Sequence, residues 1–354
     1  MAERITIAIV GTGLIGPRHA KSVLACPDAR LLCVVDPSPH AGPIAQDLGV
    51  TLYVSIEEML RTNRPDAAIV CTPNSTHVDL SVALLTAGVH VLVEKPIATS
   101  GASAQHLIDV AQVSERQLLV GHHRRFNPYV TATKRALAES AIGRVIAVSG
   151  LWTAYKPDSY FEGAGAWRGE ARSGGPILIN LVHEVDILQY LLGPITRVHA
   201  EQAISQRGLE AEEGAAVLLR FESGVVGTFL LSDVVVSPHN FEGGTGENPM
   251  VTTSGKDFYR IFGSEGTLSV GDMKTTRYAG GQPKSWSSGF TEGSVPVGDE
   301  VPFDEQIKHL VNVVRGLEEP RCTGQDALTA LMVCEAIRRA LNCDHAVMVE
   351  AAKP

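Results

Sequence analysis

One stretch near the N-terminus constrains the fold more than any other. A short apolar run, Ile5–Val10, meets a Gly-x-Gly-x-x-Gly turn at Gly11–Gly16, and a helix-like stretch follows. Gly11 allows the tight turn, Gly13 lets backbone N–H groups approach a pyrophosphate, and Gly16 lets the helix pack on the strand. The pattern predicts a Rossmann fold whose turn binds a dinucleotide through Gly11, Gly13, Leu14, Ile15 and Gly16.

A carboxylate at the end of the next strand supports this interpretation. Leu31–Val35 reads as a buried strand, and Asp36 follows it directly. Such a carboxylate accepts hydrogen bonds from the adenosine ribose and repels a 2′-phosphate. Pro37–Pro39 bring no Arg or Lys to neutralise that phosphate. The sequence therefore predicts NAD rather than NADP as the cofactor; the alternative is a solvated Asp at a strand end.

Composition excludes several classes of protein. The 354 residues are 44% hydrophobic, enough for two domains with their own cores. The net charge is -9 and basic residues are scattered, so no nucleic-acid partner is expected. Six cysteines lack a C-x-x-C pair, which favours reduced thiols in a cytoplasmic protein over disulfides or a metal site. No signal peptide or apolar span of about 18 residues is present, so no membrane partner is expected.

The chain changes character near residue 121. Residues 1–121 alternate strand and helix, which predicts an α/β Rossmann domain with a parallel, doubly wound sheet. In residues 122–354, Ala216–Phe221 and Val225–Leu230 flank a hairpin turn. We therefore expect 122–354 to form an α+β domain with a mostly antiparallel, open-faced sheet for substrate binding and oligomerisation.

Two features of this second domain bear on assembly. A sheet covered by helices on one side leaves an open face, so we expect a homodimer or homotetramer through the C-terminal sheet. The polar, glycine-rich segment 238–257 is too long for a simple connector. It is a lid, a loop exchanged between subunits, or a mobile excursion.

Five motifs together resemble the Gfo/Idh/MocA oxidoreductases, which include glucose–fructose oxidoreductase and the inositol dehydrogenases. They occur in the family's order over nearly the full length: Gly11–Gly16, Thr72–His77, Glu94–Pro96, Gly121–Pro128, and Gly174–Gly175 through His183 to Asp186. The resemblance implies an NAD-dependent dehydrogenase that oxidises a secondary hydroxyl of a sugar, cyclitol or related polyol. It also implies a cis peptide bond before Pro96.

Lys95 is the first predicted catalytic residue. It follows a strand at the carboxyl edge of the sheet, where open α/β sheets bind ligands. An ammonium there can stabilise a developing alkoxide while hydride leaves the carbon, and the resemblance assigns this role to Lys95. The alternative is a surface lysine beside a turn proline.

His183 is the second, on a predicted helix over 176–188. The resemblance implies that it shares the acid–base work with Lys95, and Asn180, three residues earlier, projects on the same side. Many relatives carry Asp where this chain has Ile179. We therefore expect Lys95 and His183 to move the proton and Asn180 to orient the substrate hydroxyl. Asp186 orients the imidazole or lies on the helix surface.

The remaining predicted contacts fall into two groups. Further cofactor contacts are expected at Thr72, Pro73, Asn74, His77, Glu94, Lys95, Pro96 and Arg124. Substrate contacts are expected at His123, Tyr155, Trp167, Arg168 and Asn180, for which a linker anchor or core packing is the alternative. Arg168 and Arg172 would suit a carboxylated substrate. The histidines lack ligand spacing, so no metal is expected.

Other functions remain open on the same scaffold. These are a reductase, an imine or dihydrodiol dehydrogenase, an enzyme that uses a tightly bound cofactor transiently to cleave glycosides, and a non-catalytic NAD-binding regulator. Retention of Lys95 and His183 argues against the regulator.

Overall fold

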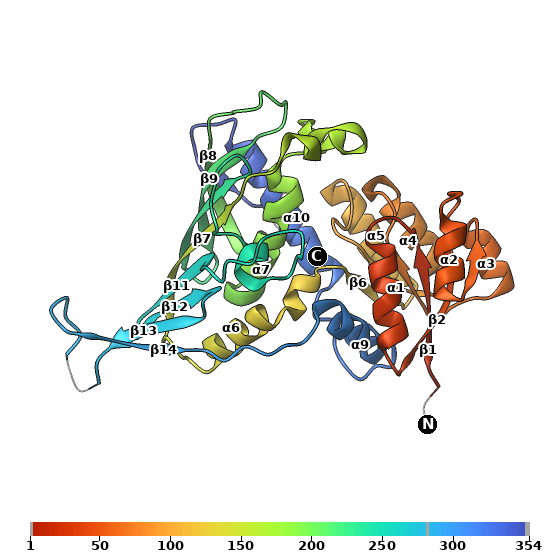
Figure 1. The fold of residues 1–354 in the computed structure, drawn as a ribbon, viewed down its shortest axis with the longest axis horizontal. Coiled ribbons are helices and arrows are strands. Elements are labelled where there is room, and N and C mark those ends of the chain that lie inside the picture. The colour runs from red at the N-terminus through yellow and green to blue at the C-terminus, as the bar shows by residue number, and fades with distance from the viewer. Residues whose placement is uncertain (1–2, 281–282, 351–354) are drawn as a thin grey trace. The chain divides into compact units, whose positions relative to one another are not determined.

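The computed structural model describes residues 3–280 and 283–350 (Figure 1). It has two compact units. The first comprises the chain up to Asn127 together with Glu300–Leu331, and the second comprises Pro128–Asp299 together with the residues from Met332. These units differ from the predicted spans 1–121 and 122–354, because the chain returns to the first unit after building most of the second.

The first unit contains a six-stranded parallel sheet in the order β3-β2-β1-β4-β5-β6. Its strands are β1 (Ile5–Val10), β2 (Ala29–Val35), β3 (Thr51–Tyr53), β4 (Ala67–Val70), β5 (His90–Val93) and β6 (Leu118–Val120). This order is that of a Rossmann fold, whose strand order reverses between β1 and β4. The predicted fold of the N-terminal part is confirmed. Continuous apolar runs form these central strands because both faces of the sheet are buried.

Helices and short 3₁₀ turns connect these strands. They are α1 (Gly16–Ala25), α2 (Ala41–Leu48), α3 (Ile56–Thr62), α4 (His77–Thr86), α5 (Gly101–Val113), η1 (Asn74–Thr76) and η2 (His123–Phe126). The returning segment adds α9 (Pro302–Val314), whose apolar face joins the core beneath α1. Three residues of α9, Ile307, Leu310 and Val311, are at most 1% exposed there. The core of the first unit therefore includes residues from both parts of the chain.

The second unit contains a nine-stranded sheet in the order β14-β13-β12-β11-β7-β10-β9-β8-β15. The strands are β7 (Val145–Thr153), β8 (Ile195–Gln202), β9 (Gly214–Phe221), β10 (Val226–Ser232), β11 (Tyr259–Gly263), β12 (Thr267–Val270), β13 (Lys274–Tyr278), β14 (Phe290–Ser294) and β15 (Val347–Met348). Neighbouring strands are antiparallel except β7 and β10, which are parallel. The mostly antiparallel sheet is confirmed, and β9 and β10 form the predicted hairpin.

Helices cover one face of this sheet. They include α6 (Pro128–Ala138), α7 (Val182–Leu192), a π turn η5 (Ile177–Leu181), 3₁₀ turns η3 (Asp158–Phe161) and η4 (Gly163–Gly169), and α10 (Gly324–Ala340), which begins in the first unit. On the other face, alternate side chains of β9 and β10 leave Leu218, Val226 and Leu230 between 45% and 54% exposed. The predicted open face is present.

The 238–257 segment packs against its own unit. It contains α8 (Phe241–Thr245), which begins where the side chain of Asn240 accepts a hydrogen bond from the Gly243 N–H at 2.7 Å. Phe241 is fully buried and stacks at an angle on Phe258. Trp152 of β7 donates to the carboxylate of Glu242 at 2.9 Å. These contacts fix the middle of the segment against β7.

Candidate active site

The glycine turn has a different steric requirement at each glycine. Gly11 has φ +96°, and a Cβ added there would lie 2.8 Å from the Cys71 backbone. A Cβ on Gly16 would lie 2.1 Å from the Gly11 carbonyl oxygen. The position of a Cβ on Gly13 has no heavy atom within 4 Å, and the neighbouring Leu14 side chain is 97% exposed. The fold therefore requires Gly11 and Gly16, whereas Gly13 leaves its backbone open to a ligand.

Asp36 is held by the same turn. Its Oδ2 accepts hydrogen bonds from the backbone N–H and the hydroxyl of Thr12, both at 2.7 Å, and its Oδ1 accepts from Ser38 N–H at 2.8 Å. Burial raises the pKa of Asp36, but these hydrogen bonds outweigh burial and hold the pKa below its ordinary value. The carboxylate is therefore ionised at neutral pH.

A pocket of about 720 Å³ opens at the carboxyl ends of β1, β2 and β4, as the Rossmann topology predicts. Its walls include the predicted residues Gly11, Gly13, Asp36, Thr72 and Pro73. They also include residues that sequence reasoning did not select: Thr12, Ser38, His40, Val54–Glu57, Cys71, Thr76 and Leu80. None of the described residues lining it is Arg or Lys. Gly13, the ionised Asp36 and this pocket together fit a dinucleotide without a 2′-phosphate.

Glu94 is a buried anion next to the predicted catalytic lysine. Its Oε1 lies 2.8 Å from His19 Nε2, and its Oε2 accepts from the Lys95 backbone N–H at 3.1 Å. Burial raises the pKa of Glu94, but the hydrogen bond and charge interaction with His19 prevail and lower it to about 2. Lys95 itself is half-buried, and the Lys95–Pro96 peptide bond is cis, as the resemblance implies.

Three other predicted cofactor residues lie near these strand ends. His77 is 1% exposed and braces two loops: Nδ1 lies 2.8 Å from the Pro96 carbonyl oxygen and Nε2 lies 2.9 Å from that of Thr72. Both ring nitrogens thus face backbone carbonyls rather than open space. Asn74 is exposed in the turn η1, and Arg124 is buried in η2.

His123 packs against the returning segment. Its ring stacks on Phe303 of α9 with ring centroids 4.4 Å apart. The guanidinium of Arg18 lies 4.0 Å from the centroid of the same Phe303 ring. His123 therefore packs against α9, and its predicted substrate contact stays a prediction.

In the second unit, the predicted helix over 176–188 is in fact two segments. The π turn η5 carries Asn180, which is 8% exposed. The helix α7 follows it and carries His183, which is 6% exposed. The start of η5 is fixed by Glu212, whose carboxylate accepts from Ile177 N–H at 3.0 Å. Single π turns are rare in proteins, but those that occur are often found at functional sites. Asp186, also on α7, is 1% exposed.

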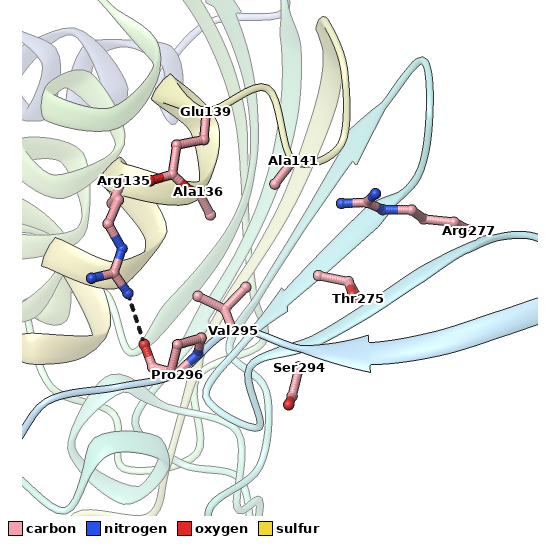
Figure 2. A pocket seen from close by; sticks show the side chains of 9 residues that line it. All are labelled: Arg135, Ala136, Glu139, Ala141, Thr275, Arg277, Ser294, Val295 and Pro296. Carbon is pink, nitrogen blue, oxygen red and sulfur yellow. Dashed lines mark hydrogen bonds between the residues drawn. The ribbon is translucent and has the colours of Figure 1, made fainter.

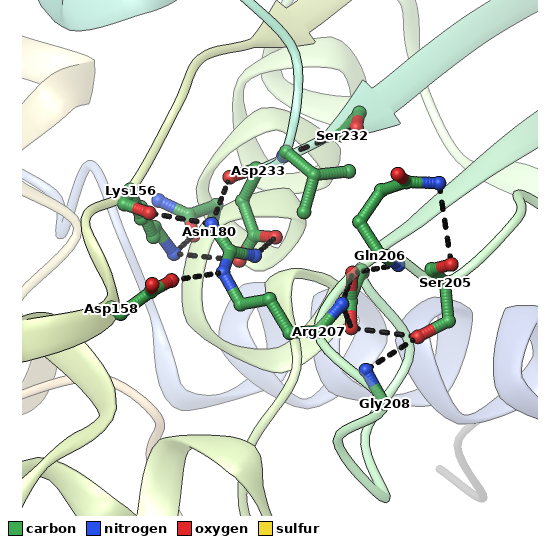
Figure 3. Close-up of polar contacts among 11 residues, drawn as sticks. Lys156, Asp158, Asn180, Ser205, Gln206, Arg207, Gly208, Ser232 and Asp233 are labelled. Carbon is green, nitrogen blue, oxygen red and sulfur yellow. Dashed lines mark hydrogen bonds and ion pairs between the residues drawn. The ribbon is translucent and has the colours of Figure 1, made fainter.

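Asn180 belongs to a polar cluster that the sequence did not reveal (Figure 3). Lys156 Nζ donates to Asn180 Oδ1 at 2.6 Å and lies 3.6 Å from the carboxylate of Asp233. Arg207 donates to the same carboxylate at 2.9 Å. Burial lowers the pKa of Lys156 to about 8, against the opposing effect of Asp233 and Glu242. A lysine in this setting belongs among the candidate functional residues.

The predicted aromatic and basic residues have varied surroundings. Arg168 is half-buried, lies over the rings of Tyr160 and Trp167, and donates to the Tyr160 carbonyl oxygen at 2.9 Å. Trp167 is 39% exposed and Tyr155 is 56% exposed. Arg168 and Trp167 thus form one cation–aromatic group, and Tyr155 lies under the guanidinium of Arg207.

A second pocket lies in the second unit (Figure 2). It has a volume of about 480 Å³ between α6 and the β13–β14 hairpin, where Arg135 donates to the Pro296 carbonyl oxygen at 3.1 Å. No residue predicted for cofactor or substrate lines it.

Within 3–280 and 283–350, no group of three or more His, Cys, Asp or Glu residues could hold a metal ion. No helix in that part of the chain is long and apolar enough to cross a bilayer. All six cysteines are free thiols, and five of them are buried.

Comparison with known proteins identifies the class. A model described as "Oxidoreductase family, NAD-binding Rossmann fold" matches residues 5–122, and the C-terminal-domain model of the same family matches 130–269. The fold and the glycine turn thus define an NAD-binding oxidoreductase with a second, sheet-based domain. The chain belongs to the Gfo/Idh/MocA family.

Individual relatives agree with this class. Inositol 2-dehydrogenase of Rhizobium meliloti (strain 1021) is 25% identical over 347 residues, 95% of this chain and 97% of that protein. The scyllo-inositol 2-dehydrogenase (NAD(+)) of Bacillus subtilis (strain 168) is 28% identical over 282 residues, 77% and 76% of the two chains. The solved structure of an oxidoreductase of Desulfitobacterium hafniense, described as NADPH-dependent, superposes with a TM-score of 0.85. Its 18% identity over 99% of both chains shows the fold alone.

Proposed function

We propose that this protein is an NAD-dependent dehydrogenase that oxidises a secondary hydroxyl of a sugar, cyclitol or related polyol. The observation that carries the cofactor choice is the ionised Asp36 in a pocket whose described lining contains no Arg or Lys. Support for the substrate class comes from the relatives named as inositol dehydrogenases. Six free cysteines agree with a cytoplasmic setting.

Each proposed catalytic residue has a distinct task. NAD, held by the glycine turn and Asp36, would supply the hydride acceptor. The Lys95 ammonium hydrogen-bonds the reacting oxygen and stabilises its developing negative charge. His183 accepts the hydroxyl proton, and Asn180 orients the hydroxyl before transfer. Lys95 belongs to the first unit, and His183 and Asn180 belong to the second.

The remaining predicted contacts complete the proposal. The glycine turn, from Gly11 through Leu14 and Ile15 to Gly16, holds the pyrophosphate, while Thr72, Pro73, Asn74 and His77 shape the adenosine side. Glu94, Pro96 and Arg124 support the nicotinamide side. Tyr155, Trp167, Arg168 and His123 contact the polyol, whose ring suits aromatic faces with hydrogen-bonding neighbours.

We further propose that two copies associate through the open face of the nine-stranded sheet. The exposed apolar residues on this face are Leu218 of β9, Val226 and Leu230 of β10, and Phe262 of β11. An apolar patch on adjoining strands favours a self-complementary partner, as in most symmetric dimers.

The decisive experiment follows reduced nicotinamide by absorbance during incubation with NAD and a panel of sugars, inositols, uronates and quinate-like acids. Lys95→Ala is the matched control and should lose turnover while its NAD dissociation constant stays near that of the native protein. Lysine-dependent reduction with one substrate class establishes the activity. Binding of NAD without reduction by any polyol would refute the proposed function, and an active Lys95→Ala would refute the role of Lys95.

A further inference from the structure

The parallel strands β7 and β10 end side by side, and two charged residues, Lys156 and Asp233, lie just beyond their C-terminal ends. Beyond the strands their pairing continues: Ala154 N–H donates to the Ser232 carbonyl and Lys156 N–H donates to the Asp233 carbonyl, both at 3.0 Å. Lys156 and Asp233 therefore project from a rigid backbone rather than from a free loop.

Asp233 is fixed by a second cation. Arg207 donates to the Asp233 carboxylate at 2.9 Å and to its backbone carbonyl at 2.8 Å. The loop that carries Arg207 is held by Glu213, which accepts from Gln206 N–H at 2.7 Å and from Arg207 N–H at 2.9 Å. Removal of Lys156 would thus leave the Asp233 carboxylate with a cationic partner, and a Lys156 variant should still fold.

The ammonium of Lys156 is used within the protein. Its side chain is 12% exposed, and Nζ lies 5.1 Å from the Trp152 ring centroid and 4.8 Å from that of Tyr160. Asn180 Oδ1 and the Asp233 carboxylate are its polar partners, at 2.6 Å and 3.6 Å. An ammonium has three N–H groups, and two of them can face these polar partners. Lys156 is therefore placed to act on Asn180.

The bond from Lys156 sets the orientation of the Asn180 carboxamide. Because Oδ1 accepts from Nζ, the Nδ2 donors lie on the other edge of the planar carboxamide, the one that does not face the ammonium. Without the ammonium, the amide could rotate and exchange donor for acceptor.

We propose that Lys156 is a positioning residue, which locks Asn180 so that its Nδ2–H group donates to an oxygen of the substrate. This inference rests on the proposed function and adds a specificity to it. Asn180 then selects an oxygen that accepts a hydrogen bond, such as the hydroxyl oxygen that becomes the product carbonyl. A substrate with a protonated amine at that carbon, which has no lone pair to accept the hydrogen bond, is disfavoured.

The test is a double-mutant cycle of Lys156→Met and Asn180→Ala, with Lys284→Met as the control for an exposed lysine. Loss of a charge-assisted hydrogen bond predicts a fall in kcat of about tenfold or more for Lys156→Met, with an unchanged dissociation constant for NAD. Lys156→Gln, which keeps a donor, should recover part of the activity. The double variant should be no slower than Asn180→Ala alone, since Lys156 acts through Asn180. Multiplied losses, or native kcat in Lys156→Met, would overturn the assignment.

A spectroscopic measurement separates this inference from the proposed function. With asparagine labelled by ¹⁵N, the side-chain amide signals of Asn180 are identified by their disappearance in Asn180→Ala. These signals should shift in Lys156→Met and stay in place in Lys284→Met, whether or not any polyol is oxidised. Unshifted signals in Lys156→Met would contradict the positioning role even if the dehydrogenase is active; shifted signals in a protein that oxidises no polyol would sink only the proposed function.

Discussion

The imidazole of His19 and the carboxylate of Glu94 are paired at 2.8 Å in the interior of the first unit. His19 lies on α1, directly after the glycine turn, and Glu94 directly precedes Lys95. The pair therefore connects the proposed pyrophosphate turn to the proposed catalytic lysine through two buried side chains. Glu94 is a positioning group in this arrangement, since its carboxylate also holds the Lys95 backbone N–H.

The first prediction concerns acid stability. The pKa of Glu94 is lowered from 4.5 to about 2 in the folded protein, so ionised Glu94 stabilises the fold above pH 4.5. This contribution, on the order of 3 kcal/mol, is lost as the pH falls from 4.5 towards 2. Urea unfolding at pH 7 should show Glu94→Gln less stable than the native protein, with a smaller difference at pH 3. The exposed variant Glu292→Gln should change little; an equal effect from both would contradict the prediction.

A second prediction separates the glycines. Gly16→Ala should lose several kcal/mol of stability, because its Cβ would lie 2.1 Å from the Gly11 carbonyl oxygen. Gly13→Ala should melt close to the native protein but bind NAD about tenfold or more weakly, since its methyl group occupies space left for the ligand. Melting curves and titration calorimetry measure the two effects. Gly42→Ala, at another position with open space, should bind NAD normally.

A third prediction concerns cofactor choice. Asp36→Asn removes the negative charge but keeps a hydrogen-bonding side chain, so repulsion of a 2′-phosphate should fall. The ratio of kcat/KM for NAD to that for NADP should decrease about tenfold or more, equivalent to roughly 1.4 kcal/mol. Asp47→Asn on α2 is the control at an exposed carboxylate. A native protein that prefers NADP would show that Asp36 does not govern the choice.

A fourth prediction addresses assembly. Leu218→Glu places a charge on the open face of the sheet and should convert a dimer into monomers, as measured by light scattering after gel filtration. Val113→Glu changes a residue on α5 that is 87% exposed and should leave the mass unaltered. A native protein that is monomeric, or a Leu218→Glu dimer, would exclude this interface.

Local patterns made much of the fold predictable. The turn Gly11–Gly16 with Asp36 specified the Rossmann sheet because its requirements lie within a few dozen residues. The hairpin of β9 and β10 was equally local. The predicted helix over 176–188 is present, but its first part is a π turn, which the apolar pattern did not indicate. Glu212, which accepts from Ile177 N–H there, is distant in the chain.

The cluster around Lys156 could not be predicted in this way. Lys156 and Asp233 meet because β7 pairs in parallel with β10, and parallel neighbours are joined through long intervening segments with no periodic signal. The contacts between Thr12 and Asp36, in contrast, could have been predicted. Thr12 lies within the glycine turn, and its hydroxyl is a hydrogen-bond donor close to the predicted carboxylate.

The contribution of α9 to the first core has a consequence for synthesis of the chain. A ribosome releases the six strands of the first sheet long before Ile307, Leu310 and Val311 emerge, and residues 128–299 are made in between. Part of the apolar surface of the nascent Rossmann sheet therefore stays exposed while the second unit is translated. A fragment that ends at Asn127 would keep that surface permanently, and it is expected to aggregate rather than to serve as an isolated NAD-binding module.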